Sequence, residues 1–452
     1  MTLVEQLAAA VHEAAAAPLP EAVRREAERS LLNVLGTAVG ASAHPLVDRL
    51  LAVAAVTGGP AVAPVPGRRE RADAFYAALA TGAAAHVDDF DDTHLATVIH
   101  PGASSLGAAL AVGAWQGRSG AELLSAFALA CEVQLRAGVA ISPAHYDEGW
   151  HITGTCGVLG AAAAASLLLG QEPAASAAAL AFAAHQTIGQ REGFGTHAKA
   201  FHAGKAAANG MLSALLVPSR PVPLDGVLEP PGGFMGALAR TSDPGLLLDG
   251  FGTRWELLRN TYKPYPCGIV AHPGIDATVE LAPQLAAAGG ADAVERVEYA
   301  CHPLVPELMG RRDPGDHLQA RFSAMHGVAV GLLDGRAGIP EFGDERAVDP
   351  QVARVRERTA FAVREDFARD EAAVEVALAD GTRVRAHVAH ARGSEARPLS
   401  DDELHAKVRE LAAPVLADAG AALIAAVGGL VAAPTLDALA TAVMPQPAEV
   451  TA

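Results

Sequence analysis

The chain has 452 residues, of which 51% are hydrophobic, 19% charged and only 4% aromatic, and its formal net charge is −17. This length exceeds what one hydrophobic core normally supports, so two domains are expected. A strongly acidic chain is repelled by phosphate backbones, which argues against nucleic acid as a partner. Abundant alanine favours closely packed helices over strands, so the fold class is predicted to be mainly α.

We expect neither a targeting sequence nor a membrane-spanning segment. The N-terminal stretch MTLVEQLAAAVHEAAAA lacks the basic and apolar segments of a signal peptide. The apolar run at residues 419–433 is too short to cross a bilayer, and the run at residues 152–170 is diluted by glycine, serine and threonine. The four cysteines form no C-x-x-C pair, which argues against a disulfide framework or a zinc knuckle. We therefore expect a cytoplasmic protein without a membrane partner.

Helical patterns fill the first part of the chain. Apolar residues recur at helical intervals from residue 23 to residue 35, and residues 104–115 and 120–136 predict two long apolar helices. Glu122 lies in the first turn of the last of these, where a negative charge suits the helix dipole.

The first polar stretch is AHVDDFDDTHLATVIHPGA at residues 85–103, between two helical runs of small residues. In a helix, Asp89 and Thr93 would lie four residues apart on one face. The sequence His100-Pro101-Gly102 then breaks the helix and begins a turn. This stretch predicts a pocket wall with an acid–base histidine at its rim.

Two other interpretations of this stretch stay open. One is a solvated helix end rich in aspartate. The other is a metal site built from His86, Asp89 and His94.

The second polar stretch, AHYDEGWH at residues 144–151, precedes a helix made almost entirely of small residues. A lone histidine at such a position is ordinarily a capping or core residue. Tyr146, Glu148 and Trp150 lie close to His151 in the sequence, and these polar and aromatic neighbours favour a functional role for His151.

The third polar stretch, at residues 193–210, places Lys199, His202 and Lys205 at intervals of three among alanine and glycine. Lys199 and His202 would share one helix face. Most lysines lie on solvated surfaces, but neighbours this small and apolar favour a crowded interior.

The fourth polar stretch, NTYKPYPCG at residues 260–268, is fixed around Lys263 by two prolines. Strands are predicted beyond it at residues 296–300, 373–378 and 382–388, and Asp380-Gly381 joins the last two as a hairpin. Residues from 399 onward return to helix. The middle of the chain therefore predicts a small α+β unit whose flanks are helical.

Motifs spread over nearly the whole chain resemble the MmgE/PrpD family, which includes 2-methylcitrate dehydratase, cis-aconitate decarboxylase and iminodisuccinate epimerase. They are Asp-Phe-Asp-Asp-Thr-His at residues 89–94, His100-Pro101-Gly102, Gly149-Trp150-His151, Lys199 with His202-Ala203-Gly204, Lys263-Pro-Tyr-Pro-Cys, Arg321-Phe322-Ser323 with His326, and Pro-Leu-Ser-Asp-Asp-Glu-Leu at residues 398–404.

The resemblance implies a large all-α domain built from both chain ends, residues 1–268 and 396–452, and a smaller α+β lid domain, residues 269–395. It also implies a homodimer that needs neither a metal nor another cofactor. The candidate catalytic residues are His100, His151, Asp89 and Tyr146. The candidate substrate-binding residues are Thr93, Lys199, Lys263, His202 and His326.

The chain departs from its resembled relatives at several motif positions. It has Gly268 where the decarboxylase has a histidine, and His326 where that enzyme has a tyrosine. The dehydratase pattern His-Pro-Ser-Asp is replaced by His-Pro-Gly-Ala at residues 100–103, which is closer to the epimerase-like branch. These departures favour neither of the two best-known substrates.

The candidate residues suit proton transfer at carbon. A C–H bond beside a carboxylate is very weakly acidic, so its cleavage needs cations near the carboxylate and a positioned base. Lysines bind carboxylates as point charges, and histidines exchange protons near neutral pH. Asp89 could orient a histidine or Thr93, as carboxylates do in catalytic triads.

We therefore expect a lyase or isomerase that moves a proton beside a carboxylate of a small di- or tricarboxylate, by dehydration or epimerisation. Three alternatives stay open. They are a decarboxylase of the cis-aconitate type, a metal-dependent hydrolase and a catalytically silent binding protein.

Overall fold

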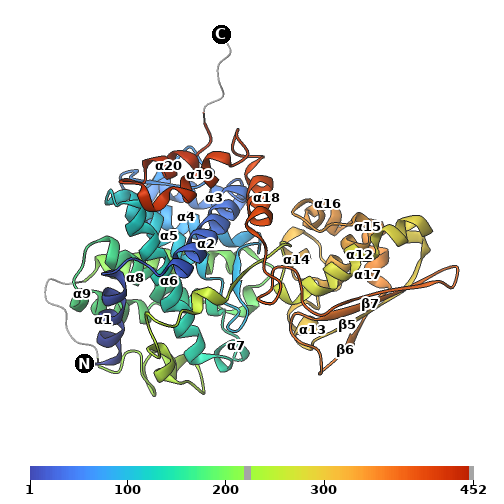
Figure 1. Ribbon diagram of the computed structural model, residues 1–452, viewed down its shortest axis with the longest axis horizontal. Helices are drawn as coiled ribbons and strands as arrows, with labels where there is room; N and C mark the ends of the chain where they lie inside the picture. Colours follow the sequence, from blue (N-terminus) through green and yellow to red (C-terminus); the bar gives the residue numbers. More distant parts are fainter. Residues whose placement is uncertain (218–224, 447–452) are drawn as a thin grey trace, which may run out of the picture.

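The structure is a computed structural model that describes residues 1–217 and 225–446. Helices make up most of it, which confirms the prediction of a mainly α fold (Figure 1). The helices before residue 260 are α1 (Leu3–Ala15), α2 (Glu21–Gly40), α3 (Pro45–Thr57), α4 (Ala74–Val87), α5 (Pro101–Trp115), α6 (Gly120–Ile141), α7 (Ala144–Asp147), α8 (Ile152–Leu168), α9 (Pro173–Ala184), α10 (His197–Leu215) and α11 (Phe234–Leu238).

Small residues let the central helices of this part approach one another closely. Helix α10 packs against both α4 and α8. A Cβ atom added at Gly82 of α4 would lie only 2.9 Å from the Cα atom of Gly204 in α10. This close approach brings the N-terminal turn of α10, with Lys199, beside the segment that follows α4.

The later part of the chain forms a smaller unit around a four-stranded sheet. The strand order is β6 (Thr359–Val363), β5 (Val294–Cys301), β7 (Ala372–Leu378), β8 (Arg383–Val388), and only the β5–β6 pair is parallel. The other elements are α12 (His272–Ala288), α13 (Leu304–Met309), α14 (His317–Ala320), α15 (Ala324–Asp334), α16 (Asp344–Ala347) and α17 (Pro350–Glu357). The predicted β7–β8 hairpin is confirmed, with Val376 opposite Val384.

Two separate hydrophobic clusters account for most of the buried apolar residues. The first joins residues 4–257 with residues 408–443, and the second spans residues 265–388. After the sheet, α18 (Asp401–Ala412), α19 (Ala421–Gly428) and α20 (Asp437–Ala442) complete the chain, and α18 packs against α2 (Figure 1). The domain boundaries at residues 268 and 396 stay a prediction.

The segment after α4 is not the helix that the sequence spacing suggested. Helix α4 ends at Val87, and Asp89 has a positive φ of 49°. Thr93 lies in the short strand β3 (Asp92–His94), which pairs with β4 (Asn260–Tyr262). Partners distant in the sequence bind the aspartates here, so the local helical spacing of Asp89 and Thr93 does not decide the backbone.

Among the described residues, one helix is long and apolar enough to cross a membrane, namely α6. In its most apolar window 89% of the residues are buried inside the protein. The bent pair of α2 and α3 passes the same test only when the two helices are taken as one span, although they meet at an angle of 84°. Burial on this scale is typical of a core helix, and a core helix passes the same test of length and composition.

Candidate active site

A cavity of about 490 Å³, including its open mouth, lies where the large helical part meets the sheet-containing part. The polar residues of its lining, here called the polar wall, are Asp89, Thr93, His100, Tyr146, His151, Lys199 and Lys263. The apolar residues of its lining, here called the apolar wall, are Val98, Phe194, Gly268, Ile269, Val270, Leu308, Met309 and Phe322.

Two lysines bind one carboxylate in the polar wall. Lys199 Nζ lies 2.5 Å from Asp89 Oδ1, and Lys263 Nζ lies 3.0 Å from the same oxygen. Lys263 also donates a hydrogen bond of 2.9 Å to the backbone carbonyl of Asp89. Burial alone would raise the pKa of Asp89, but the charges of Lys199 and Lys263 hold it below the usual range. Asp89 is therefore ionised.

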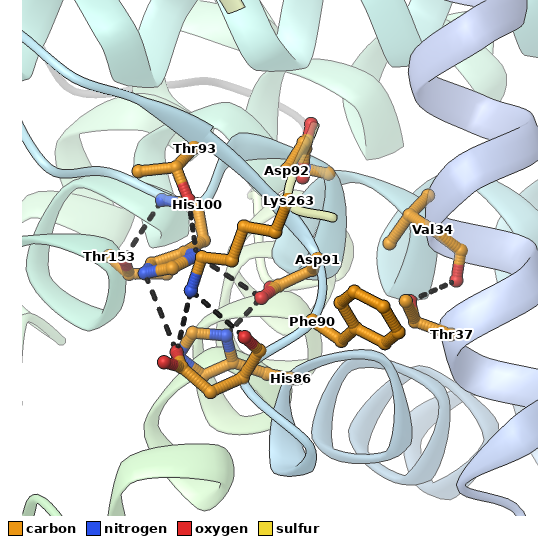
Figure 2. A network of polar contacts seen from close by, with 12 residues as sticks. Val34, Thr37, His86, Phe90, Asp91, Asp92, Thr93, His100, Thr153 and Lys263 are labelled. Atoms are coloured by element: carbon orange, nitrogen blue, oxygen red, sulfur yellow. Dashed lines mark hydrogen bonds and ion pairs between the residues drawn. The ribbon is translucent and has the colours of Figure 1, made fainter. Parts of the chain in front are cut away.

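His100 lies beside this cluster and contacts two acceptors through one ring nitrogen (Figure 2). Its Nδ1 lies 3.1 Å from Asp91 Oδ1 and 3.2 Å from Thr93 Oγ1, and its backbone N–H donates to Thr153 Oγ1. Burial lowers the pKa of His100 to about 3, although the charge of Asp91 opposes the shift. Because an ionised Asp91 can only accept, the proton of the neutral ring belongs on Nδ1. Nε2 is then an unprotonated base.

Asp91 carries out the orienting role that the sequence suggested for Asp89. Its Oδ2 accepts a hydrogen bond of 2.7 Å from His86 Nδ1, and its Oδ1 faces His100. Burial alone would raise the pKa of Asp91, but the contacts with His86 and His100 outweigh burial and hold the pKa well below its usual range. His100 Nε2 is 4.0 Å from Asp89 Oδ1, so Asp89 is a lysine partner and not the carboxylate that fixes the histidine ring.

His151 is the second histidine of the cavity lining. It precedes α8, and its Nδ1 lies 3.1 Å from His202 Nδ1. Its Nε2 is buried and has no hydrogen-bond partner within the described residues. Burial, together with the charges of His86 and Lys199, shifts the pKa of His151 well below its usual value. His151 is thus neutral and can accept a proton.

Tyr146 is the remaining acid–base candidate of the polar wall. Arg191 lies over its ring, 4.3 Å from the centroid, and donates a hydrogen bond of 3.0 Å to the Tyr146 carbonyl. Burial raises the pKa of Tyr146 to about 12. The hydroxyl therefore remains protonated at neutral pH and can donate a hydrogen bond or a proton.

Residues 5–247 match the MmgE/PrpD N-terminal domain, and residues 265–428 match the MmgE/PrpD C-terminal domain. The chain belongs to the MmgE/PrpD family. The resemblance inferred from the motifs is confirmed.

Curated relatives of this MmgE/PrpD protein include cis-aconitate decarboxylases. The mouse enzyme is 27% identical over 92% of this chain and 88% of its own length. The human enzyme is 27% identical over 92% of this chain and 89% of its own length. The cis-aconitate decarboxylase-like protein oryM of Aspergillus oryzae is 26% identical over 78% of each chain. These relatives indicate a lyase-type enzyme of the family.

In this MmgE/PrpD protein, seven of the nine predicted site residues line the cavity, and they are the seven of the polar wall. His202 does not line the cavity, but it contacts His151 from behind. His326 also lies elsewhere, because its Nε2 is 2.9 Å from the Glu341 carbonyl oxygen and its ring is fully buried. The hydrogen bonds of His326 are those of a core histidine, and its predicted contact with substrate stays a prediction that the cavity lining does not support.

The predicted metal set of His86, Asp89 and His94 does not converge. His94 Nδ1 contacts Thr97 Oγ1, and its Nε2 faces Glu256 at 3.4 Å. Potential ligand atoms within 4.8 Å of one another instead come from His86, Asp91 and His100. Asp91 already pairs with both histidines. The closeness of these three side chains is therefore explained by their role in orienting the His100 ring.

The sequence interpretation missed a lysine that holds the site together. Lys407 Nζ of α18 donates to the Asn33 side chain at 2.8 Å and to the backbone carbonyls of Phe90 at 2.7 Å and Lys263 at 2.9 Å. Burial lowers the pKa of Lys407 to about 7. Lys407 lies three residues after the buried Leu404, so a lysine within the apolar stripe of α18 was a signal available in the sequence.

Proposed function

We propose that this protein is a lyase or isomerase that moves a proton at a carbon beside a carboxylate of a small di- or tricarboxylate. One observation carries the proposal, namely that two lysines bind a single carboxylate next to two neutral histidines in one cavity. A substrate carboxylate near Lys199 and Lys263 would gain charge stabilisation as its neighbouring carbon loses a proton.

The proposed roles follow from the free ring nitrogens. His100 Nε2 accepts the proton, because Asp91 and Thr93 hold the opposite nitrogen of that ring. His151 is the second acid–base group, and its Nε2 either removes a proton from the substrate or returns one. Tyr146 stays protonated and donates to the charge that develops on the substrate oxygen.

Decarboxylation is the second candidate, and the names of the curated relatives favour it. Loss of carbon dioxide leaves a carbanion that must be protonated, and the same histidines can supply a proton that was first taken from water. Dehydration and epimerisation use the same polar wall but differ in the group that leaves.

Product analysis by NMR separates these reactions. Cis-aconitate, a hydroxy tricarboxylate and an amino or imino dicarboxylate are incubated separately with the enzyme. Release of carbon dioxide, release of water or inversion at carbon each identifies one reaction. His390→Asn, at an exposed ring, serves as the control and should retain activity, whereas His100→Asn should not. No reaction with any member of the three classes would contradict the proposed function.

We propose further that the reaction needs no metal or other cofactor. The basis is that His86, Asp91 and His100 are engaged with one another. Dialysis against a chelator should leave kcat unchanged. Loss of activity that added zinc restores would instead support the metal-dependent hydrolase.

We also propose that the protein is a homodimer in the cytoplasm, on the basis of the family resemblance. Light scattering at micromolar concentration should give twice the chain mass, and the monomer mass would refute the dimer.

A further inference from the structure

The two walls of the cavity differ in what they can bind. Within the described residues, the lining contains two cations, Lys199 and Lys263, and one anion, Asp89. Two positive charges against one negative charge leave one uncompensated positive charge. This balance suits one substrate carboxylate at the lysines.

Arg321 and Arg191 pair with other groups and are not among the residues that line the cavity. The Arg321 side chain is 3% exposed, and its guanidinium donates to Asp88 Oδ1 at 2.7 Å and to the Asp88 carbonyl at 2.8 Å. Arg191 pairs with Glu307 at 3.1 Å. Hydroxyls of Thr93 and Tyr146 remain as donors for a second carboxylate.

A third carboxylate would have only residues of the apolar wall left to contact. That wall offers side chains of aliphatic, aromatic and thioether type and no charged group. Burying a carboxylate against such atoms without a donor is strongly unfavourable. Burying an alkyl group there is favourable, because it removes apolar surface from water.

Met309 and Gly268 shape the centre of the apolar wall. Met309 is 1% exposed, and a Cβ atom added at Gly268 would lie 2.3 Å from its Sδ. The thioether therefore fills the space that a side chain at position 268 would occupy. The Met309 side chain thus occupies the place where a polar side chain at position 268 could otherwise bind a carboxylate.

We propose that the substrate is an alkyl-substituted dicarboxylate of low charge, not a tricarboxylate, with its apolar arm against Met309. This inference rests on the proposed function, because it takes a carboxylate to be the group bound at Lys199 and Lys263. Met309 is the residue that determines this specificity.

Calorimetric binding of unreactive saturated acids tests the inference on the full-length enzyme. The series is succinate, methylsuccinate and propylsuccinate, with tricarballylate as the tricarboxylate. Each added methylene should tighten binding roughly fourfold, and tricarballylate should bind more weakly than propylsuccinate. Tighter binding of tricarballylate to the unaltered enzyme would overturn the inference.

Substitutions at position 309 sharpen the test. Met309→Lys should reverse the order and make tricarballylate the tighter ligand, whereas the control Met309→Leu should keep the alkyl preference. An unchanged order in Met309→Lys would contradict the assigned role of Met309. If that variant fails to fold, Met309→Gln replaces it and should abolish the gain per methylene while succinate binding persists. A persisting gain in Met309→Gln would likewise count against Met309.

A second measurement separates this inference from the proposed function. Solvent deuterium exchange at carbon, measured on the three candidate substrate classes named above, reports the proton transfer, and the binding series reports the specificity. An alkyl preference in the binding series without exchange in any candidate substrate would refute the proposed function and support the specificity. Exchange in a candidate substrate together with tighter binding of tricarballylate would do the reverse.

Discussion

Asp89 and Asp92 lie three residues apart in one acidic run and are both buried, but their partners differ completely. Asp89 faces the cavity and is bound by two lysines. Asp92 faces away and accepts from Ser30 Oγ at 2.7 Å, Asn260 Nδ2 at 2.6 Å and the Gly102 N–H at 3.1 Å. A carboxylate held by neutral donors fixes the backbone, whereas one held by cations at a cavity belongs to the chemistry.

The pKa values of the two groups separate in the same way. Burial, together with the nearby charge of Asp91, raises the pKa of Asp92 to about 6, whereas the two lysines keep the pKa of Asp89 below its usual range. Gly102 permits the close approach to Asp92, because a Cβ atom there would lie 2.7 Å from Asp92 Oδ1. Neighbouring positions with the same side chain thus serve structure and function respectively.

The largest expected effect comes from the polar wall. His100→Asn should lower kcat by roughly 10²–10⁴-fold, the usual contribution of an acid–base group. His151→Asn should act similarly if the two rings work as a pair. Steady-state kinetics on the identified substrate gives the measurement, and full activity in either variant would remove that histidine from the mechanism.

The next effect concerns the lysines on Asp89. Lys199→Met should cost about 1.5–3 kcal/mol of transition-state stabilisation, because a charge-assisted contact is lost. The loss is measured as a fall in kcat/KM. An unaltered kcat/KM in both Lys199→Met and Lys263→Met would contradict the assignment of the carboxylate-binding position.

Much of this contrast was predictable from the sequence, and part of it was not. The polar stretches marked every residue of the polar wall, because charged side chains stand out among alanine and glycine. The spacing could not show that Asp91 rather than Asp89 orients His100, since β3 forms only by pairing with a strand about 170 residues later in the chain.

His326 occupies a motif position but lies in a core environment, which only the packing reveals. The edge strand β6 escaped prediction because it is short and half exposed.

A stability measurement sharpens the structural side of the comparison. Asp92→Ala leaves three buried donors without their acceptor, so the free energy of unfolding should fall by roughly 1–3 kcal/mol. Chemical denaturation measures this change, and kcat per folded molecule should fall far less than in His100→Asn. Unchanged stability with a kcat as low as that of His100→Asn would place Asp92 in the chemistry instead.

The last expected effect is a pH dependence of stability. Asp92 has a pKa of about 6 in the folded protein and about 3.8 when unfolded, so the folded state binds more protons between these values. Its contribution is therefore present below about pH 4 and lost as pH rises through 6. Asp89 and Asp91, whose folded pKa values are lowered, contribute in the opposite direction, and their contribution is lost as pH falls.

Measuring the free energy of unfolding at several pH values isolates the contribution of Asp92. Relative to Asp92→Asn, the unaltered protein should lose stability between about pH 4 and 6, because only it carries the titrating carboxyl. A stability difference that is constant over this range would contradict the raised pKa.

Hydrogen exchange at substrate carbon tests the central claim most directly. The enzyme is incubated with an alkyl-substituted dicarboxylate in deuterated water, and NMR follows deuterium at the carbon beside each carboxylate. The polar wall predicts incorporation by the unaltered enzyme and by His390→Asn, and its loss in His100→Asn. Equal incorporation in His100→Asn and in the unaltered enzyme would contradict the account.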